Sequence, residues 1–362
     1  MFNSTETELN MTRQVKVGNV PIGGGAPISV QSMTNTDTAD APATIEQIKR
    51  LFDAGCEIAR MTVNNVQAAR SVREIVDASP LPIVADIHFD YRLAISSIES
   101  GVSAVRINPG NIGDEGRIKT LCDCVKAHGV PVRVGVNAGS LEKELLREYG
   151  RPCPEALVKS ALGHAEILER HGVGDIVLSL KTSDVADTVR AYRLAASSCD
   201  YPLHIGVTEA GTCEMGLVKS AIGIGALLLD GIGDTMRVSL SGDPVMEVKA
   251  AIDILNAAGI RRDFVDVISC PTCGRTGIDV EGLATRVRNA TRHIKKPLKV
   301  AIMGCVVNGP GEAREADVGV AGGAGAGVLF MKGKPNVKIE GDIYAALVKA
   351  IEELLGEALA NE

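Results

Sequence analysis

The sequence predicts an α/β fold, a (β/α)8 TIM barrel followed by a smaller α/β domain. Short β-branched runs alternate with segments of helical periodicity through the first two thirds of the chain, which is typical of a parallel sheet. Eight such runs fall within about 240 residues, close to the usual size of a closed barrel. An open doubly wound sheet is the competing fold, but it more often has five to seven strands.

The eight predicted strands share short runs of β-branched and apolar residues. They cover residues 27–33, 57–63, 82–88, 104–110, 131–137, 175–181, 202–209 and 235–241. The preceding segment, 15–24, predicts a hairpin that plugs the bottom of the barrel.

The segments between the strands predict helices. In 44–55 the apolar residues expected on one face are Ile45, Ile48, Leu51 and Phe52. Thr44 and Gln47 have the spacing of a capping box, so the helix is expected to begin there.

The last barrel helix is predicted within 242–259, and 259–264 resembles a linker. We therefore expect a substrate-binding barrel over residues 1–260 and a second domain over 261–362. The glycine-rich stretch 321–330 has neither a dinucleotide fingerprint nor a P-loop lysine, so it predicts a turn between strands.

Composition excludes several classes of protein. The chain has 362 residues, a net charge of −7 and a pI near 5.5, which argues against nucleic acid as a partner. No apolar run is long enough to span a membrane, and the polar N-terminus is unlike a secretory signal. We expect a cytoplasmic protein whose nine cysteines do not form a disulfide framework.

Polar side chains gather at or just after the carboxyl ends of the predicted strands. Five are cations, namely Arg60, Arg106, Arg133, Lys181 and Arg237. The others are Asp86, His88, Asn108, Asn137, Glu209, Ser239 and Ser241. Barrel active sites lie at this face, and several guanidinium groups with an ammonium suit a diphosphate or several carboxylates. The pattern predicts a site for a strongly anionic small molecule.

The arginines, His88 and Glu209 admit more than one role, and His204 needs separate treatment. Each arginine alone could pair with a core acid instead of a ligand. His88 is suited to polar contact with substrate, whereas His204 lies early in its strand and is expected to be structural. Glu209 could balance the cations or deliver a proton to a leaving oxygen.

Three cysteines of the second domain suggest a metal centre. Cys270 and Cys273 form a C-x-x-C pair after one predicted strand, and Cys305 follows another. Zinc would ordinarily take a fourth Cys or a His, but neither follows Cys305, and Glu312 is the nearest plausible oxygen ligand. An iron–sulfur cluster tolerates three thiolates and one weaker ligand, which leaves an iron able to act as a Lewis acid and electron donor. A structural zinc site is the alternative.

Five segments together resemble the bacterial 4-hydroxy-3-methylbut-2-enyl diphosphate synthases of the non-mevalonate isoprenoid pathway. They read ISCPTCGRT (268–276), MGCVVNGPGEA (303–313), ADIHFDYRLA (85–94), VRINPGNIG (105–113) and LSLKTSD (178–184). The resemblance covers nearly the whole chain. No large insertion separates the two domains, as in the compact bacterial form.

The resemblance implies an oxidoreductase that converts 2-C-methyl-D-erythritol 2,4-cyclodiphosphate to (E)-4-hydroxy-3-methylbut-2-enyl diphosphate. Two electrons would come from flavodoxin or ferredoxin through a [4Fe-4S] cluster in an iron–sulfur domain of sulfite-reductase or ferredoxin-like type. Cys270, Cys273 and Cys305 would hold three irons, with Glu312 on the fourth until substrate displaces it. A head-to-tail homodimer is implied as well, one subunit's cluster domain capping the other's barrel.

The family's site residues match this chain position by position. Those implied to bind substrate are Arg60, Asp86, His88, Arg106, Asn108, Arg133, Asn137, Lys181, Arg237 and Ser239. Glu209 is the expected proton donor, and Glu312 takes part in catalysis as the replaceable ligand.

Two rival functions come from other classes. One is a zinc-stabilised binder of an anionic metabolite without catalysis. The other is an aldolase-like barrel in which Lys181 forms a Schiff base, although the group of five cations to which it belongs suits phosphate better.

Overall fold

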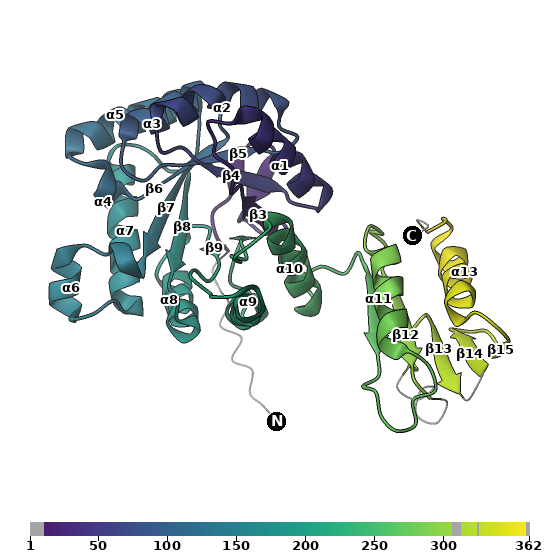
Figure 1. Ribbon diagram of the computed structural model, residues 1–362. Helices are drawn as coiled ribbons and strands as arrows, with labels where there is room; N and C mark the ends of the chain where they lie inside the picture. The colour runs from purple at the N-terminus through teal and green to yellow at the C-terminus, as the bar shows by residue number, and fades with distance from the viewer. Residues whose placement is uncertain (1–10, 306–312, 324–325, 360–362) are drawn as a thin grey trace. The chain divides into compact units, whose positions relative to one another are not determined.

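The computed structural model describes residues 11–305, 313–323 and 326–359. The chain divides into two compact units, one ending at Ala258 and the other beginning at Gly259. The first contains strands β1–β10 and the second contains β11–β15 (Figure 1). Each unit has its own apolar core.

The first unit is an eight-stranded parallel barrel, which confirms the predicted fold class. Its strands are β3 (Ser29–Met33), β4 (Ile58–Thr62), β5 (Ile83–Asp86), β6 (Ala104–Ile107), β7 (Val132–Asn137), β8 (Ile176–Lys181), β9 (His204–Ile205) and β10 (Thr235–Met236). The strand order is β8-β7-β6-β5-β4-β3-β10-β9. A parallel bridge between Leu178 and Leu203 joins the two ends of this order, so the sheet closes on itself.

A short hairpin packs against one end of the barrel interior. Strands β1 (Val15–Val17) and β2 (Val20–Ile22) pair antiparallel, as predicted. Val17 and Ile22 share a small apolar cluster with Ile58, Val84 and Ala104, which come from three neighbouring barrel strands. The hairpin therefore fills the bottom of the barrel.

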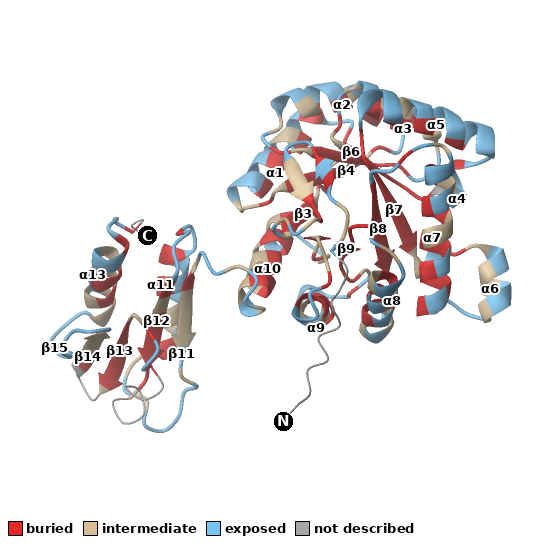
Figure 2. Ribbon diagram, turned by 180° about the vertical axis from the view of Figure 1, so that it is seen from behind, coloured by how far each residue is buried: buried red, intermediate tan, exposed pale blue. Residues whose placement is uncertain are grey.

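Helices surround the strands of the first unit (Figure 1). They are α1 (Ala41–Asp53), α2 (Val66–Ala78), α3 (Tyr91–Glu99), α4 (Pro109–Ile112), α5 (Glu115–His128), the 3-10 helix η1 (Ala138–Ser140), α6 (Lys143–Tyr149), α7 (Pro154–Arg170), α8 (Val185–Ser198), α9 (Cys213–Leu229) and α10 (Pro244–Ala257). Figure 2 shows buried strands inside and helices that expose their outer faces. No helix in the described ranges has the length and apolarity needed to cross a membrane.

Helix α1 corrects two details of the sequence prediction. It begins three residues before Thr44, because Asp40 caps it by accepting a hydrogen bond from the Ala43 N–H, so the predicted capping box is wrong. Gln47 instead accepts a hydrogen bond from the Asn35 N–H. Phe52 is 50% exposed and does not belong to the buried face.

The second unit is a five-stranded mixed sheet with two described helices. Its strands are β11 (Val265–Ser269), β12 (Leu298–Met303), β13 (Val318–Gly323), β14 (Ala326–Met331) and β15 (Val337–Ile339), and its helices are α11 (Val280–Thr291) and α13 (Ile343–Leu355). Strands β11, β12 and β13 pair in parallel, whereas β14 pairs antiparallel with both β13 and β15. In the glycine-rich segment, residues 321–323 and 326–330 belong to the antiparallel strands β13 and β14, and the predicted turn falls on 324–325, outside the described residues.

Candidate active site

The side-chain alternation of the strands places the predicted cations inside the barrel. Ile58 and Ala104 face the interior, because they pack against the hairpin at its bottom. Side chains two residues apart share a face, so Arg60 and Arg106 also point inward, one layer nearer the carboxyl ends. Asp86 stands in register with Arg106, on the neighbouring strand.

Asp86 is the shared partner of two arginines. Its carboxylate lies 3.2 Å from Nη1 of Arg106 and 3.7 Å from Nε of Arg60, and all three side chains are nearly buried. Burial alone would raise the pKa of Asp86, but the two guanidinium groups hold it below its ordinary value. Burial lowers the pKa of Arg60 to about 10, against the opposing effect of Asp86. Asp86 thus serves as a counter-charge that fixes two cations.

Gly135 of β7 gives Arg106 the room to reach Asp86. A Cβ at Gly135 would stand 2.3 Å from Nε of Arg106, closer than atoms can approach. Arg106 also donates a hydrogen bond to the Gly135 carbonyl at 3.2 Å. A glycine is therefore required beside this guanidinium.

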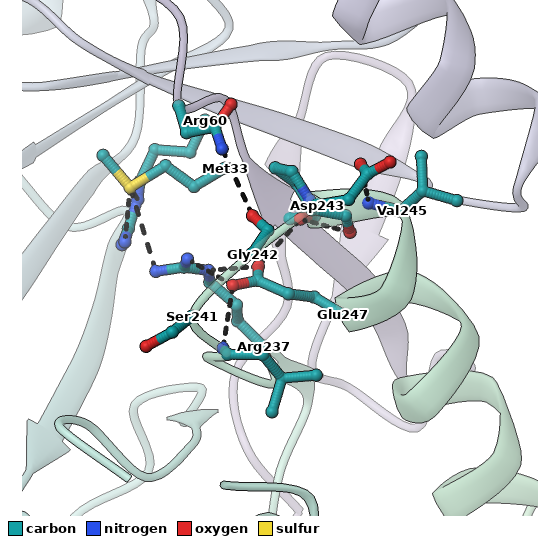
Figure 3. A network of polar contacts seen from close by, with 12 residues as sticks. Met33, Arg60, Arg237, Ser241, Gly242, Asp243, Val245 and Glu247 are labelled. Carbon is teal, nitrogen blue, oxygen red and sulfur yellow. Dashed lines mark hydrogen bonds and ion pairs between the residues drawn. The ribbon is translucent and has the colours of Figure 1, made fainter. Parts of the chain in front are cut away.

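Arg237 is held by Glu247 of α10, a residue that the sequence analysis does not single out. Glu247 is buried and accepts hydrogen bonds from Arg237 through Nε at 3.1 Å and Nη2 at 2.9 Å. Met33 lies between Arg237 and Arg60 and accepts from Arg60 through its thioether sulfur (Figure 3). This network links β3, β4, β10 and α10.

Arg133 and Lys181 have no carboxylate partner in the described part of the chain. Arg133 donates to Oε1 of Gln31 at 2.6 Å, while its Nε and Nη2 atoms are buried without a partner among the described residues. Lys181 lies against Gly206, where an added Cβ would stand 3.0 Å from Nζ. Burial, reinforced by the nearby Arg60, lowers the pKa of both groups well below the ordinary values. No described carboxylate forms an ion pair with either of these two cations.

His204 lies deeper in the same interior and is fully buried. Its Nδ1 is 3.4 Å from Oγ1 of Thr235. Burial, with Arg133 second, lowers the pKa of His204 well below its ordinary value, so the ring is neutral. A neutral ring beside cations is compatible with the structural role expected of it.

The remaining predicted residues lie after strand ends. His88 is exposed after β5, Asn137 ends β7 half-buried, and Ser239 is half-buried after β10. Asn108 is buried and caps α4 by accepting from the Gly110 N–H at 3.1 Å. Ser241 is exposed and donates to the Gly211 carbonyl.

Glu209 is exposed after β9 and has an unusual backbone. Its φ of 51° is the one positive φ of a non-glycine residue in the described ranges. A residue other than glycine, asparagine or aspartate rarely adopts this conformation, which costs about 1–3 kcal/mol. Such strain is common at functional sites, so it supports a role for Glu209 without assigning one.

In the second unit, the strands that precede Cys270 and Cys305 are parallel neighbours, as predicted. The Gly304 N–H donates to Sγ of Cys270 at 3.1 Å. The Gly277 N–H donates to the Gly304 carbonyl, so the C-x-x-C loop is tied at both ends to the residue before Cys305. Backbone donation to a thiolate is typical of iron–sulfur ligation, so the donor set fits such a group.

The ligand set itself is only partly described. Cys270 and Cys305 are half-buried, Cys273 is exposed, and none of the nine cysteines, all within the described ranges, forms a disulfide. Across those ranges no three His, Cys, Asp or Glu side chains stand close enough to hold a metal ion. Glu312, the predicted fourth ligand, lies outside the described residues.

Two family models match the chain. The GcpE TIM-barrel domain matches residues 12–252, and the GcpE protein C-terminal domain matches residues 266–353. Together they cover both units of the structure.

Curated relatives are similar over nearly the full length. A protein of Caldanaerobacter subterraneus subsp. tengcongensis is 59% identical over 96% of this chain and 98% of its own, and one of Geobacter sulfurreducens is 55% identical over the same shares. Both are named 4-hydroxy-3-methylbut-2-en-1-yl diphosphate synthase (flavodoxin).

Among solved structures, an N-acetylneuraminic acid synthetase from Leptospira borgpetersenii has a TM-score of 0.51 and 14% identity. The match covers 78% of this chain and 99% of that one. At such low identity this similarity concerns the fold alone.

Proposed function

The chain belongs to the GcpE family, and on this premise we propose that it is a 4-hydroxy-3-methylbut-2-en-1-yl diphosphate synthase. It would convert 2-C-methyl-D-erythritol 2,4-cyclodiphosphate to (E)-4-hydroxy-3-methylbut-2-enyl diphosphate. The observation that carries the proposal is the barrel interior, where five cations on or just after different strands are accompanied by only two carboxylates. Such a pocket suits a diphosphate.

The reaction is a reductive elimination of water that opens a ring. The bond between a ring carbon and a phosphate oxygen breaks, and the oxygen keeps the electron pair. A hydroxyl group leaves with one proton as water. The substrate dianion, two electrons and one proton therefore give the product trianion and water.

The chain's own residues bind and orient the diphosphate. Arg60 and Arg106 are fixed by Asp86, and Arg237 is fixed by Glu247, so their guanidinium groups need little reorganisation to meet phosphate oxygens. Arg133 and Lys181 lack a counter-charge and would gain one from the ligand. The matched residues His88, Asn108, Asn137 and Ser239 would make the remaining polar contacts.

We propose that Glu209 donates the proton with which the hydroxyl group leaves as water. Its carboxyl group is exposed after β9, where solvent can reload it between turnovers. The positive φ supports a functional reason for a glutamate at this position.

Cys270, Cys273 and Cys305 would hold a [4Fe-4S] cluster, with Glu312 as the ligand that substrate displaces. When bound, the cluster would pass on, one at a time, the two electrons that the donor supplies, and would offer a Lewis-acidic iron. The hydrogen bond from Gly304 to Cys270 supports thiolate ligation at this position. The relatives' names indicate flavodoxin, so we propose flavodoxin before ferredoxin as donor, and a reducing, cytoplasmic setting.

We also propose a head-to-tail homodimer in which one subunit's second domain serves its partner's barrel. Helix α9 has an exposed apolar face that supports self-association, formed by Met215, Val218, Ile222 and Leu229. Mixing a Cys305→Ala chain with a Glu209→Gln chain should restore activity in heterodimers. No restored activity would place the whole site within one chain.

Anaerobic purification followed by iron, sulfide and zinc analysis tests the cofactor. We expect brown protein with iron and sulfide, and product formation from the cyclodiphosphate with reduced flavodoxin. Colourless zinc protein that binds the cyclodiphosphate without turnover would instead support the non-catalytic alternative.

A further inference from the structure

The barrel interior carries more positive charge than its own carboxylates balance. The ionic groups of the interior are four buried cations, the partly buried Arg237, and two buried carboxylates, Asp86 and Glu247. If every group is ionised, five cations against two carboxylates leave three positive charges. His88 and Glu209 are exposed after strand ends, where water screens them, and no described ion pair joins Glu209 to a cation.

Arg133 and Lys181 account for two of these charges. Arg133 is 5% exposed and has two nitrogen atoms without a partner among the described residues. Lys181 is 7% exposed and contacts no described carboxylate. The depressed pKa of Lys181 has the same origin, since burial and four neighbouring arginines disfavour its charge while no anion is present. Asp86 offsets the charge of Arg133 only in part, and no described carboxylate forms an ion pair with either cation, so both gain a counter-charge when an anion enters.

The third charge comes from the sharing of Asp86. One carboxylate stands between Arg60 and Arg106, so one of these two guanidinium charges is unbalanced. The unbalanced positive charge therefore lies along one side of the barrel, on strands β4, β6, β7 and β8.

The substrate and the product of the proposed reaction differ in charge. In a cyclic diphosphate each phosphoryl group bears one ionisable oxygen, which gives a charge of about −2. An open-chain diphosphate monoester ionises once more, with a pKa near 6, and so approaches −3 at neutral pH. The negative charge that appears on ring opening resides on a phosphate oxygen.

We propose that this pocket matches the charge of a ring-opened diphosphate monoester, and binds it more tightly than the cyclic diphosphate. The inference rests on the proposed function and deepens it. Because the extra charge develops as the carbon–oxygen bond breaks, the fixed cations stabilise the transition state more than the substrate.

The test compares three ligands on the oxidised holoenzyme by anaerobic titration calorimetry, without reductant. They are the cyclodiphosphate, isopentenyl diphosphate, and isopentenyl diphosphate methylated on its terminal phosphate, which has the same chain and one charge less. We expect isopentenyl diphosphate to bind at least tenfold tighter than the other two, or about 1.4 kcal/mol. Equal affinities would overturn the inference while leaving the proposed function intact. Failure of all three ligands to bind would contradict both.

A variant separates charge from steric effects of the methyl group. Lys181→Met keeps the length of the side chain and removes its charge, so the preference for isopentenyl diphosphate should shrink several-fold. Lys159→Met, which loses an exposed ion pair with Glu148 on the outside of the barrel, is the matched control and should leave all three affinities unchanged. An undiminished preference in folded Lys181→Met, with its melting temperature near that of the unaltered protein, would overturn the inference.

Discussion

Glu247 accepts two hydrogen bonds from the guanidinium group of Arg237, at 3.1 Å from Nε and 2.9 Å from Nη2. The same carboxylate accepts from the Leu240 N–H and from Oγ of Ser32, each at 3.0 Å. A side chain of α10 therefore fixes a barrel cation, the turn after β10 and strand β3. Its role is to position Arg237, since it is buried behind that residue.

Glu247→Gln should destabilise the protein and weaken anion binding. The amide cannot accept all four hydrogen bonds, and Arg237 loses its counter-charge in a buried setting. We expect the free energy of unfolding in urea to fall by about 3 kcal/mol. The affinity for inorganic pyrophosphate should fall while the turnover number changes less than KM, because the residue orients a binding group.

Glu166→Gln is the control for this change, because Glu166 is exposed on α7. It should alter stability by less than about 0.5 kcal/mol. Equal effects of the two substitutions would refute the positioning role of Glu247.

Asp86→Asn should destabilise the protein in a pH-dependent way. The folded-state pKa of Asp86 lies below its ordinary value of 3.8, so the carboxylate contributes stability above that pH and loses it as the pH falls through the folded-state pKa. Urea unfolding at pH 7, 5, 4 and 3 gives the free energy of unfolding of the variant and of the unaltered protein. The difference between the two should be about 3 kcal/mol at neutral pH and should become smaller below pH 4.

Asp77→Asn serves for comparison, because its carboxylate is 65% exposed at 3.9 Å from Arg73. It should change stability little at any pH. If the loss of unfolding free energy caused by Asp86→Asn stayed constant from pH 7 to pH 3, the charge of Asp86 could not be its cause.

Gly135→Ala should impair anion binding with the fold retained. The new Cβ would occupy the space of the Arg106 guanidinium, which must leave both Asp86 and the pocket. We expect the Kd for inorganic pyrophosphate to rise at least tenfold, or about 1.4 kcal/mol. Gly139→Ala, where an added Cβ meets no atom within 4 Å, should bind normally. Matching affinities in both variants would show that Arg106 does not need this space.

Much of the barrel follows from the sequence because its signals are local. Each β-branched run carries a polar residue in its second half, and the alternation of side chains places Arg60 and Arg106 on the inside once the strands are assigned. Every predicted strand is shorter in the structure, and two of them, 202–209 and 235–241, shrink to the pairs His204–Ile205 and Thr235–Met236.

What the sequence does not reveal depends on tertiary contacts. Glu247 looks like any acidic residue of an amphipathic helix until α10 packs beside β3 and brings it to Arg237. Met33 reads as an apolar strand residue, but its sulfur contacts two guanidinium groups. A glycine such as Gly135 ordinarily weakens a strand. Its presence is explained only by the Arg106 guanidinium, which lies where a Cβ would be. Partners from distant segments leave no pattern in either segment alone.

Substitutions at Glu209 should separate catalysis from stability. Glu209→Gly removes the strain of a positive φ, so the melting temperature should rise, by an amount equivalent to about 1 kcal/mol. Glu209→Gln keeps the side-chain size but cannot donate a proton from a carboxyl group. Both variants should bind pyrophosphate normally and lose turnover with reduced flavodoxin. Full turnover in Glu209→Gln would eliminate this residue as the proton donor.

Cysteine substitutions should distinguish the proposed cluster ligands from other thiols. Cys270 accepts a hydrogen bond from the Gly304 N–H, and the parallel strands β11 and β12 bring Cys305 toward the same loop. Loss of one of three thiolates leaves too few strong ligands, so Cys270→Ala and Cys305→Ala should lose most iron and sulfide on anaerobic purification. Cys213→Ala, at an exposed thiol on α9, should keep both. The barrel is a separate compact unit, so all three variants should still bind pyrophosphate. Undiminished iron in Cys305→Ala would remove it from the ligand set and leave the assignment of the second unit without support.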